Sequence, residues 1–307
     1  MSIYEICGDP QRRHDFILLF EVTDGNPNGD PDAGNLPRVD PETMQGLVTD
    51  VCLKRKVRNY VSLAKRGAAG YGIYINDEGK ALNRLHQNAY DEAGIKSSGS
   101  KQSRPDVDNV QARMCKNFYD IRMFGAVMTT KVNAGQVRGP MQMTFARSVS
   151  PVIPMDISIT RVAITKEEDA KVVIGEDGQE GKGGKTTEIG RKPIVPYGLY
   201  VGRGFFSVPF AEDSGAARED LELFWTALVN MWDLDHSASR GLMACRGLYV
   251  FSHDDRLGNA PAHTLFSRFE AELRKGTEAP RRFEDYKVYL NDRDLPEGVT
   301  LTRLVGD

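Results

Sequence analysis

The sequence has only four cysteines among 307 residues, Cys7, Cys52, Cys115 and Cys245, and no two of them form a C-x-x-C pair. Such spacing marks zinc sites and many disulfide scaffolds, so the sequence predicts neither, and we expect free thiols. The five histidines are equally dispersed and contain no H-x-x-x-H pair. Nothing in the sequence therefore indicates a metal or another cofactor.

Long apolar runs are also missing. The longest, such as Phe16–Phe20, are far too short to span a bilayer. The first residues show no basic region followed by an apolar stretch and a cleavage site, so we expect a cytoplasmic protein without membrane contact. With 307 residues, 40% of them hydrophobic and 27% charged, the chain is expected to fold as one large elaborated globular domain or as two.

Catalytic motifs are scarce. The sequence contains no G-x-S-x-G motif and no local pairing of cysteine with histidine, so an enzyme is the minority interpretation. The loop from Asp24 through Asp30 and Asp32 fits the first part of a calcium-binding EF-hand loop, but Asn35 stands where a bidentate carboxylate is required. We therefore expect a plain structured loop that holds no metal.

Charge is nearly balanced, with 40 basic and 43 acidic residues, but it is segregated along the chain. Residues 1–50 hold ten acidic residues against three basic ones, whereas residues 51–76 contain basic residues and no acid. Residues 110–165 hold seven basic residues against Asp120 and Asp156. Such blocks are compatible with an anionic polymer as partner, although solvated helix surfaces are the commoner explanation.

The first elements are clear in the pattern. His14 to Val22 is rich in apolar, β-favouring residues and predicts a central strand that runs into a long loop. A helix is predicted from Asp40, as N-cap, with Pro41 at its first position, to about residue 65. The basic residues of this helix share the face opposite its apolar stripe: Lys54, Arg55, Arg58 and Lys65.

The rest of the chain predicts a mixed fold. Residues 66–112 are polar and Gly-rich with one helical stretch at 81–92, and we interpret them as an insertion. Strands are expected at 141–149, 155–165 and 241–252, the first two half-buried, and a helix at 218–233. The element order indicates an α+β sandwich with helices on one face.

Residues 162–197 are predicted to form a projecting hairpin. The segment is polar and rich in glycine, yet apolar strand-like stretches flank it on both sides. Near its end, Ile194 and Val195 lie between prolines and follow Arg191 and Lys192. We expect these two apolar residues to act as a wedge that unstacks a base step beside phosphate-binding cations.

Another stretch, from Arg203 to Phe210, meets five of the seven specified positions of the RNP1 signature and misses at Phe206 and Ser207. In that signature, aromatic side chains on a strand stack on RNA bases. Packing of the phenylalanines in the core explains the match equally well.

Four segments together carry a resemblance to a known family: HDFILLFEVTDGNPNGDPDAGNLPRVDPETMQG, DIRMFGAVM, NAGQVRGPMQMTFARSVSPV and GLYVGRGFF. They resemble the crRNA-coating backbone subunit of the type I-C CRISPR effector complex (Cascade), in the RAMP superfamily, from residue 14 to about residue 252. The resemblance implies a single elaborated RRM-like (ferredoxin-like) palm over 1–307, with fingers at 66–112 and a thumb hairpin at 162–197.

The resemblance also implies a function. Several copies are expected to polymerise along one CRISPR RNA, with other Cascade subunits as partners, and to leave the guide free to pair with target DNA. The residues expected to face the guide backbone are Asn26, Asn28, Arg38, Thr43, Gln45, Lys54, Arg55, Arg58, Gln136, Arg138, Arg191, Lys192, Ser239 and Arg240.

Two alternatives remain open. Some related RNA-targeting subunits cut RNA with an aspartate in an early loop, so a metal-dependent ribonuclease that uses Asp24, Asp30 and Asp32 is the first. A conventional RRM protein that stacks single-stranded RNA on Phe205 and Phe210 is the second.

Overall fold

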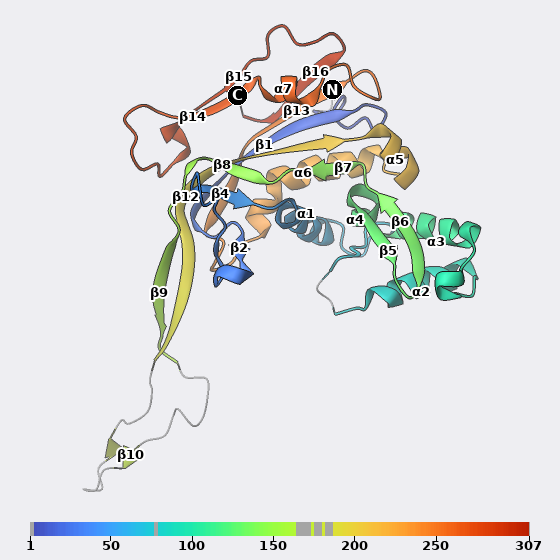
Figure 1. The fold of residues 1–307 in the computed structure, drawn as a ribbon, viewed down its shortest axis with the longest axis horizontal. Coiled ribbons are helices and arrows are strands. Elements are labelled where there is room, and N and C mark those ends of the chain that lie inside the picture. The colour runs from blue at the N-terminus through green and yellow to red at the C-terminus, as the bar shows by residue number, and fades with distance from the viewer. Residues whose placement is uncertain (1–2, 77–78, 164–172, 175–179, 182–186, 307) are drawn as a thin grey trace.

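The computed structural model describes residues 3–76, 79–163, 173–174, 180–181 and 187–306. They form a mixed α/β fold around an antiparallel sheet (Figure 1), and the strand order along the sheet is β16-β13-β1-β12-β8-β4, with β7 and β9 also paired to β12. These strands are β1 (His14–Gly25), β4 (Gln45–Val48), β7 (Met141–Met143), β8 (Ala146–Pro151), β9 (Met155–Arg161), β12 (Glu188–Phe206), β13 (Leu242–His253) and β16 (Val299–Val305).

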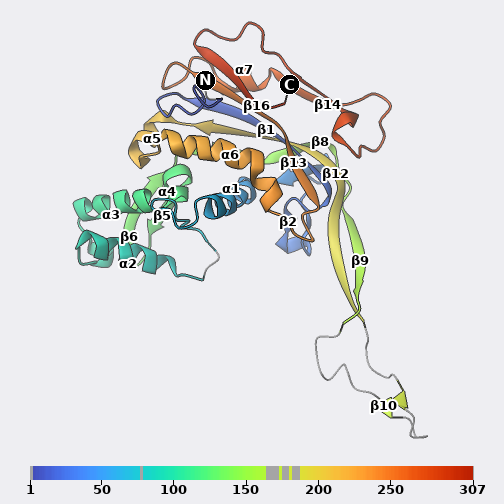
Figure 2. The same cartoon turned by 180° about the vertical axis from the view of Figure 1, so that it is seen from behind.

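The helices lie on one face of this sheet or beside it, except for the short last one, which packs on the opposite face (Figures 1 and 2). They are α1 (Asp50–Ala64), α2 (Leu82–Ala93), α3 (Arg104–Asn117), α4 (Tyr119–Phe124), α5 (Val208–Ser214), α6 (Arg218–Leu234) and α7 (Ala262–Phe266). None of the helices in the described ranges is long and apolar enough to cross a membrane. The smaller strands are β2 (Gly29–Asp30), β3 (Leu36–Pro37), β5 (Gly125–Thr129), β6 (Asn133–Arg138), β10 (Val173–Ile174), β11 (Glu180–Gly181), β14 (Phe269–Leu273) and β15 (Tyr286–Leu290).

Strand β1 is the predicted central strand, and the structure confirms it. It is hydrogen-bonded to β12 on one edge and to β13 on the other, and every residue from His14 to Val22 is buried. Alternate side chains enter different cores: Phe16, Leu18 and Phe20 meet α1 and α6, whereas Ile17 and Leu19 face the opposite layer. A strand buried on both faces is apolar throughout rather than alternating, which explains its sequence.

The C-terminal segment covers the second face of the sheet. Strand β16 extends the sheet beside β13, and α7 with the β14–β15 hairpin packs on Ile17, Leu19 and Tyr249. Helices α1 and α6 therefore cover one face of the sheet, and the C-terminal segment, for which the sequence predicted no role, covers the other. The mixed α/β architecture with a central antiparallel sheet is confirmed.

The predicted start of the first long helix is wrong. Helix α1 begins at Asp50, and the Thr49 side chain caps it by accepting a hydrogen bond from the Cys52 N–H. Residues 45–48 instead form β4, whose backbone groups pair with those of β8, and residues in a helix could not make these bonds to β8. Asp40 caps only a turn, since its carboxylate accepts from the N–H groups of Glu42 and Thr43.

Other predicted elements are confirmed within a residue or two: the helices at 81–92 and 218–233 appear as α2 and α6, and the strand at 241–252 as β13. Helices α2 and α3 and the β5–β6 hairpin lie to one side of the sheet (Figure 1) and share a core of their own, which runs from Tyr74 to Val137. Its buried His86 donates its Nδ1–H to the Val132 carbonyl, and its Nε2 accepts from the Tyr74 hydroxyl, each over 2.8 Å.

A two-stranded arm projects from the sheet (Figures 1 and 2), formed by β9 and the first part of β12. Its register runs from Met155 opposite Ile194 to Arg161 opposite Glu188. The prediction that the strand at 155–165 is half-buried is wrong, because every residue of β9 is exposed. The predicted glycine-rich centre of the hairpin, with Gly175, Gly178, Gly183 and Gly184, lies outside the described residues.

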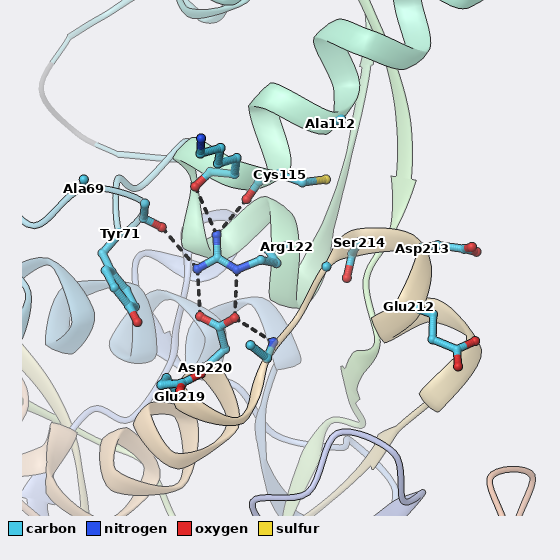
Figure 3. A pocket seen from close by; sticks show the side chains of 14 residues that line it. Ala69, Tyr71, Ala112, Cys115, Arg122, Glu212, Asp213, Ser214, Glu219 and Asp220 are labelled. Carbon is cyan, nitrogen blue, oxygen red and sulfur yellow. Dashed lines mark hydrogen bonds and ion pairs between the residues drawn. The ribbon is translucent and has the colours of Figure 1, made fainter.

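A buried ion pair fastens α4 to α6 (Figure 3). The Arg122 guanidinium donates to the Asp220 carboxylate twice, over 2.8 Å from Nε to Oδ2 and 2.7 Å from Nη2 to Oδ1. It also donates to the carbonyls of Gly70 and Cys115, and Asp220 accepts from the Ala217 N–H. This one guanidinium therefore links α3, α4 and the chain before them to the first turn of α6.

Stability should fall in acid because of His14. The neutral ring is fully buried, its Nε2–H donates to the Asp9 carbonyl over 2.8 Å, and Nδ1 accepts from the Ser252 hydroxyl over 2.9 Å. Burial lowers the pKa of His14 from 6.5 to about 4. Because the unfolded chain then binds the proton more tightly, stability is complete above pH 6.5 and is lost as the pH falls toward 4, by about 3 kcal/mol.

Urea unfolding at pH 7 and pH 5 measures this loss. His14→Gln, which cannot titrate, should be less stable at pH 7 but should lose less stability between the two pH values than the wild type. Equal losses in both proteins would contradict the assignment to His14.

Removing the Arg122 guanidinium should be costly. Arg122→Met leaves the Asp220 carboxylate, 4% exposed, without its partner, and breaking a buried pair in this way costs about 3–5 kcal/mol. Arg256→Met is the matched control, since its partner Glu212 is exposed and such pairs contribute about 0–1 kcal/mol. Chemical unfolding of both variants tests this, and similar losses would show that the Arg122 pair is not a special anchor.

Candidate nucleic-acid interface

The loop between β1 and β4 is held in place by two of the predicted site residues. Asn28 accepts hydrogen bonds at Oδ1 from the N–H and the hydroxyl of Thr49, both over 2.9 Å. Asn26 donates its backbone N–H to the Ser239 carbonyl and its side-chain amide to the Asn35 carbonyl, each over 2.7 Å. Both asparagines therefore shape the loop, which brings its backbone to the N-terminus of α1.

Two cations attach this loop to the chain before β13. Arg240 donates from Nη1 to the carbonyls of Asn26 and Pro27, and its Nε lies 3.3 Å from the Asp235 carboxylate. Lys56, from α1, binds the same carboxylate. Burial lowers the pKa of Lys56, although the neighbouring Asp235 opposes this. Neither Lys56 nor Asp235 was predicted to belong here, since no local pattern signals a pair so distant in sequence.

The basic face predicted on α1 exists, but much of it contacts protein. Lys54, 8% exposed, lies 3.0 Å from Asp50 and 3.2 Å from the Gln142 amide oxygen. Arg58 binds the buried Asp120 carboxylate over 2.8 Å, and Arg55 donates to a backbone carbonyl, that of Ile75, over 2.7 Å. Lys54 and Arg58 both lie against the ring of Phe124, at 5.7 and 5.2 Å.

A shallow groove of about 360 Å³ connects this face to β6. Phe124, Gln142 and Phe210 line it, together with Arg138. The exposed Arg138 guanidinium lies 4.8 Å from the Phe210 ring and has no carboxylate partner within the described ranges. The buried Lys54 does not line the groove itself, but it contacts two of the lining residues, Phe124 and Gln142. Gln136 is also exposed on β6.

The remaining loop residues lie at the β4 edge. Gln45 donates its amide to the Ser148 carbonyl over 2.9 Å, whereas Thr43 is exposed. Arg38 lies 3.4 Å from Asp30, and its buried Nε has no hydrogen-bond partner. Ser239 is exposed at its side chain, although its carbonyl is used by Asn26.

The arm carries Arg191 and Lys192, and Arg191 is 77% exposed with its guanidinium 2.9 Å from Asp156. The predicted apolar wedge is wrong, because Ile194 and Val195 are 5% and 0% exposed. They lie where β12 enters the sheet and are covered by protein. The apolar side chains that the arm does expose are those of Met155, Ile157, Ile159 and Ile189.

The aspartates of the early loop do not converge on a metal site. Asp30 binds Arg38 and accepts from the Asp32 N–H, and Asp24, the residue before the end of β1, has a positive φ of 48°. The part of the chain that the structure describes contains no group of three histidine, cysteine, aspartate or glutamate side chains able to hold a metal ion.

Phe205 is part of the protein core on the sheet face that the C-terminal layer covers. Its ring lies 5.7 Å from that of Phe266, on α7, with the two planes at 61°. The face that an RRM uses for base stacking is therefore occupied at this position, and core packing explains the RNP1-like match.

Comparisons with known proteins agree on one family. A family model described as "CRISPR-associated protein Cas7" matches residues 12–291. The protein named CRISPR-associated protein Cas7 from Haloferax volcanii is 25% identical over 241 residues, which are 71% of this chain. The chain spans 64% of the length of that relative.

Two solved chains are similar in fold. One, from a "CRISPR RNA-guided surveillance complex, pre-nicking", has a TM-score of 0.47 and 17% identity over 78% of this chain and 75% of its own. The other, from a "CRISPR RNA-guided surveillance complex", has a TM-score of 0.43 and 15% identity over 80% of this chain and 70% of its own. The family model alone covers most of the chain, and on that match the chain belongs to the Cas7 family of CRISPR-associated proteins.

Proposed function

We propose that this chain is a non-catalytic subunit that binds a CRISPR guide RNA along its sugar-phosphate backbone. The observation that carries the proposal is the exposed Arg138 of β6, which lines the groove beside Phe210 and has no carboxylate partner among the described residues, in a chain of the Cas7 family. The Arg138 guanidinium can neutralise a phosphate, and the exposed Gln136, two residues earlier on the same strand, can offer its amide to a phosphate oxygen or a 2′-hydroxyl. None of these groups selects a base, as a subunit that accepts any guide requires.

The predicted site residues divide into two sets in this proposal. Those with exposed or half-exposed polar groups contact RNA, namely Arg38, Thr43, Gln136, Arg138, Arg191, Lys192, Ser239 and Arg240. Those bound within the protein position the contact surface, namely Asn26, Asn28, Gln45, Lys54, Arg55 and Arg58.

The finer assignments follow the resemblance. We propose a type I-C Cascade subunit of the cytoplasm, of which several copies coat the guide beside other Cascade subunits and leave it free to pair with a target DNA strand. The sheet with α1 and α6 acts as the RRM-like palm, residues 66–112 belong to the fingers and residues 162–197 to the thumb. The printed name of the relative, CRISPR-associated protein Cas7, supports the coarser part of this assignment, a Cas7 subunit.

The exposed apolar face of the arm suits the thumb role. Met155, Ile157 and Ile159 alternate with polar residues along β9, so they share one side of a two-stranded ribbon. Their exposed fractions are 46, 37 and 50%, so they form an exposed apolar patch of the kind that marks a contact surface. In the proposed polymer this side contacts guide nucleotides or the next copy, in place of Ile194 and Val195.

RNA affinity should depend steeply on salt and not on sequence. If about six phosphates are neutralised by each subunit, the single-strand slope of about −0.7 per contact gives a loss of about 300-fold between 50 and 200 mM salt. Fluorescence anisotropy with several unrelated single-stranded RNAs measures both properties. Equal affinity at the two salt concentrations would overturn backbone-driven binding.

Arg138→Glu should weaken all of these RNAs alike, by about tenfold or more, because it removes one phosphate contact and adds a repulsive charge. Arg256→Glu is the control, since Arg256 is exposed, pairs with the exposed Glu212 and belongs to none of the proposed contacts. A loss confined to one RNA sequence would instead indicate base recognition.

The nuclease alternative gives a different result. Incubation of the protein and guide with complementary RNA and Mg²⁺ or Mn²⁺ should leave the RNA intact. Cleavage that disappears in Asp24→Ala, Asp30→Ala or Asp32→Ala would show catalysis and replace the non-catalytic proposal.

A further inference from the structure

A second basic surface lies between the C-terminal half of α1 and the chain that follows it. It surrounds a cavity of about 490 Å³, here called the basic pocket. Four of its lining residues are cationic, Arg55, Arg58, Lys65 and Arg66, and no described residue that lines it is acidic. The opposite wall is residues 67–76, the start of the insertion.

Only one of these four cations is balanced by a carboxylate in the part of the chain that the structure describes. Arg58 is paired with Asp120. Arg55 donates to a carbonyl, and Lys65 lies 5.1 Å from the Tyr71 ring. Arg66 is exposed. Three positive charges thus border one concavity without compensation.

This differs from the N-terminal half of the same helix. There Lys54 is paired with Asp50, and Lys56 with Asp235. The helix dipole does not neutralise the cations at the C-terminal end of α1, because the free carbonyls there supply only about half a negative charge. Three full charges exceed that amount, so the basic pocket keeps a positive potential that favours an anion.

We propose that the basic pocket binds a phosphodiester group of a nucleic-acid strand, an inference that rests on the proposed function and adds to it a contact at Lys65 and Arg66. One guanidinium group can donate two parallel hydrogen bonds to two oxygens of a phosphate. The neighbouring Asn59 amide and Ser62 hydroxyl can donate to a further oxygen. The cavity volume exceeds that of one phosphate and accommodates the attached sugar.

A strand held in the basic pocket bridges α1 and the start of the insertion. Arg55 already joins the two, since its Nη1 donates to the Ile75 carbonyl over 2.7 Å. A phosphate bound by Lys65 at the end of α1 and by Arg66 of the following chain adds a second connection. Amide hydrogen exchange over residues 66–76 should therefore slow when nucleic acid binds.

The test is the double variant Lys65→Gln/Arg66→Gln, with Lys275→Gln/Arg281→Gln as the control. Both pairs are exposed, so neither change should alter the melting temperature much, and each removes two positive charges. Loss of two phosphate contacts should reduce the salt slope by about 1.4 and the affinity at 0.15 M salt by about 15-fold. The probes are a labelled single-stranded RNA of mixed sequence and the same RNA annealed to complementary DNA.

A loss with the single-stranded RNA supports the proposal and assigns the phosphate to the guide, and a loss only with the hybrid supports it and assigns the phosphate to the paired strand. Unchanged affinity and salt slope with both probes, or losses equal to those of the control, would overturn the basic pocket while the proposed function stands. If the wild-type protein binds neither probe, both proposals fail.

Discussion

The fold depends on a strand that has no free side. β1 is hydrogen-bonded along both edges and buried on both faces, so its alternating phenylalanines and leucines hold two separate cores together. Because the C-terminal layer covers the sheet face opposite the helices, a ligand cannot lie across the centre of the sheet. The binding groups that we propose therefore lie at its margins: the loop after β1, the exposed groups of α1, the β5–β6 hairpin and the arm.

At these margins the nearest carboxylate decides what a cation does. Arg122 and Arg58 have geometry suited to phosphate, yet each is committed to a buried aspartate, and their loss would damage the fold. Arg138, by contrast, lies on the Phe210 ring and pairs with no carboxylate among the described residues, which leaves its outer donors available. Positive charge in the sequence is thus a poor guide to the interface, and uncompensated positive charge is a better one.

The sequence predicted what depends on local pattern. The unbroken apolar run His14–Val22 indicated a central strand, and the periodicity at 218–233 indicated a helix, because burial on both faces or on one stripe leaves a direct record. The start of α1 was misplaced because Asp40 and Pro41 form a good helix N-terminus locally, whereas pairing of residues 45–48 with β8 is a long-range choice. Ile194 and Val195 failed as a wedge for the same reason.

The candidate interface was harder to predict, because its members are joined by contacts between distant segments. Asp235 binds Lys56 and Arg240 and so closes the loop 235–240 against α1, yet nothing near Asp235 in the sequence indicates this. Long-range pairing with carboxylates compensates the positive charge of some residues of the basic block 51–76, such as Lys56 and Arg58, and leaves others without a counter-charge. A block of like charge in a sequence can therefore be judged as a binding surface only when the carboxylates that pair with it in the folded chain are known. In this chain the cations of the block that keep no carboxylate partner among the described residues, Arg55, Lys65 and Arg66, line the basic pocket.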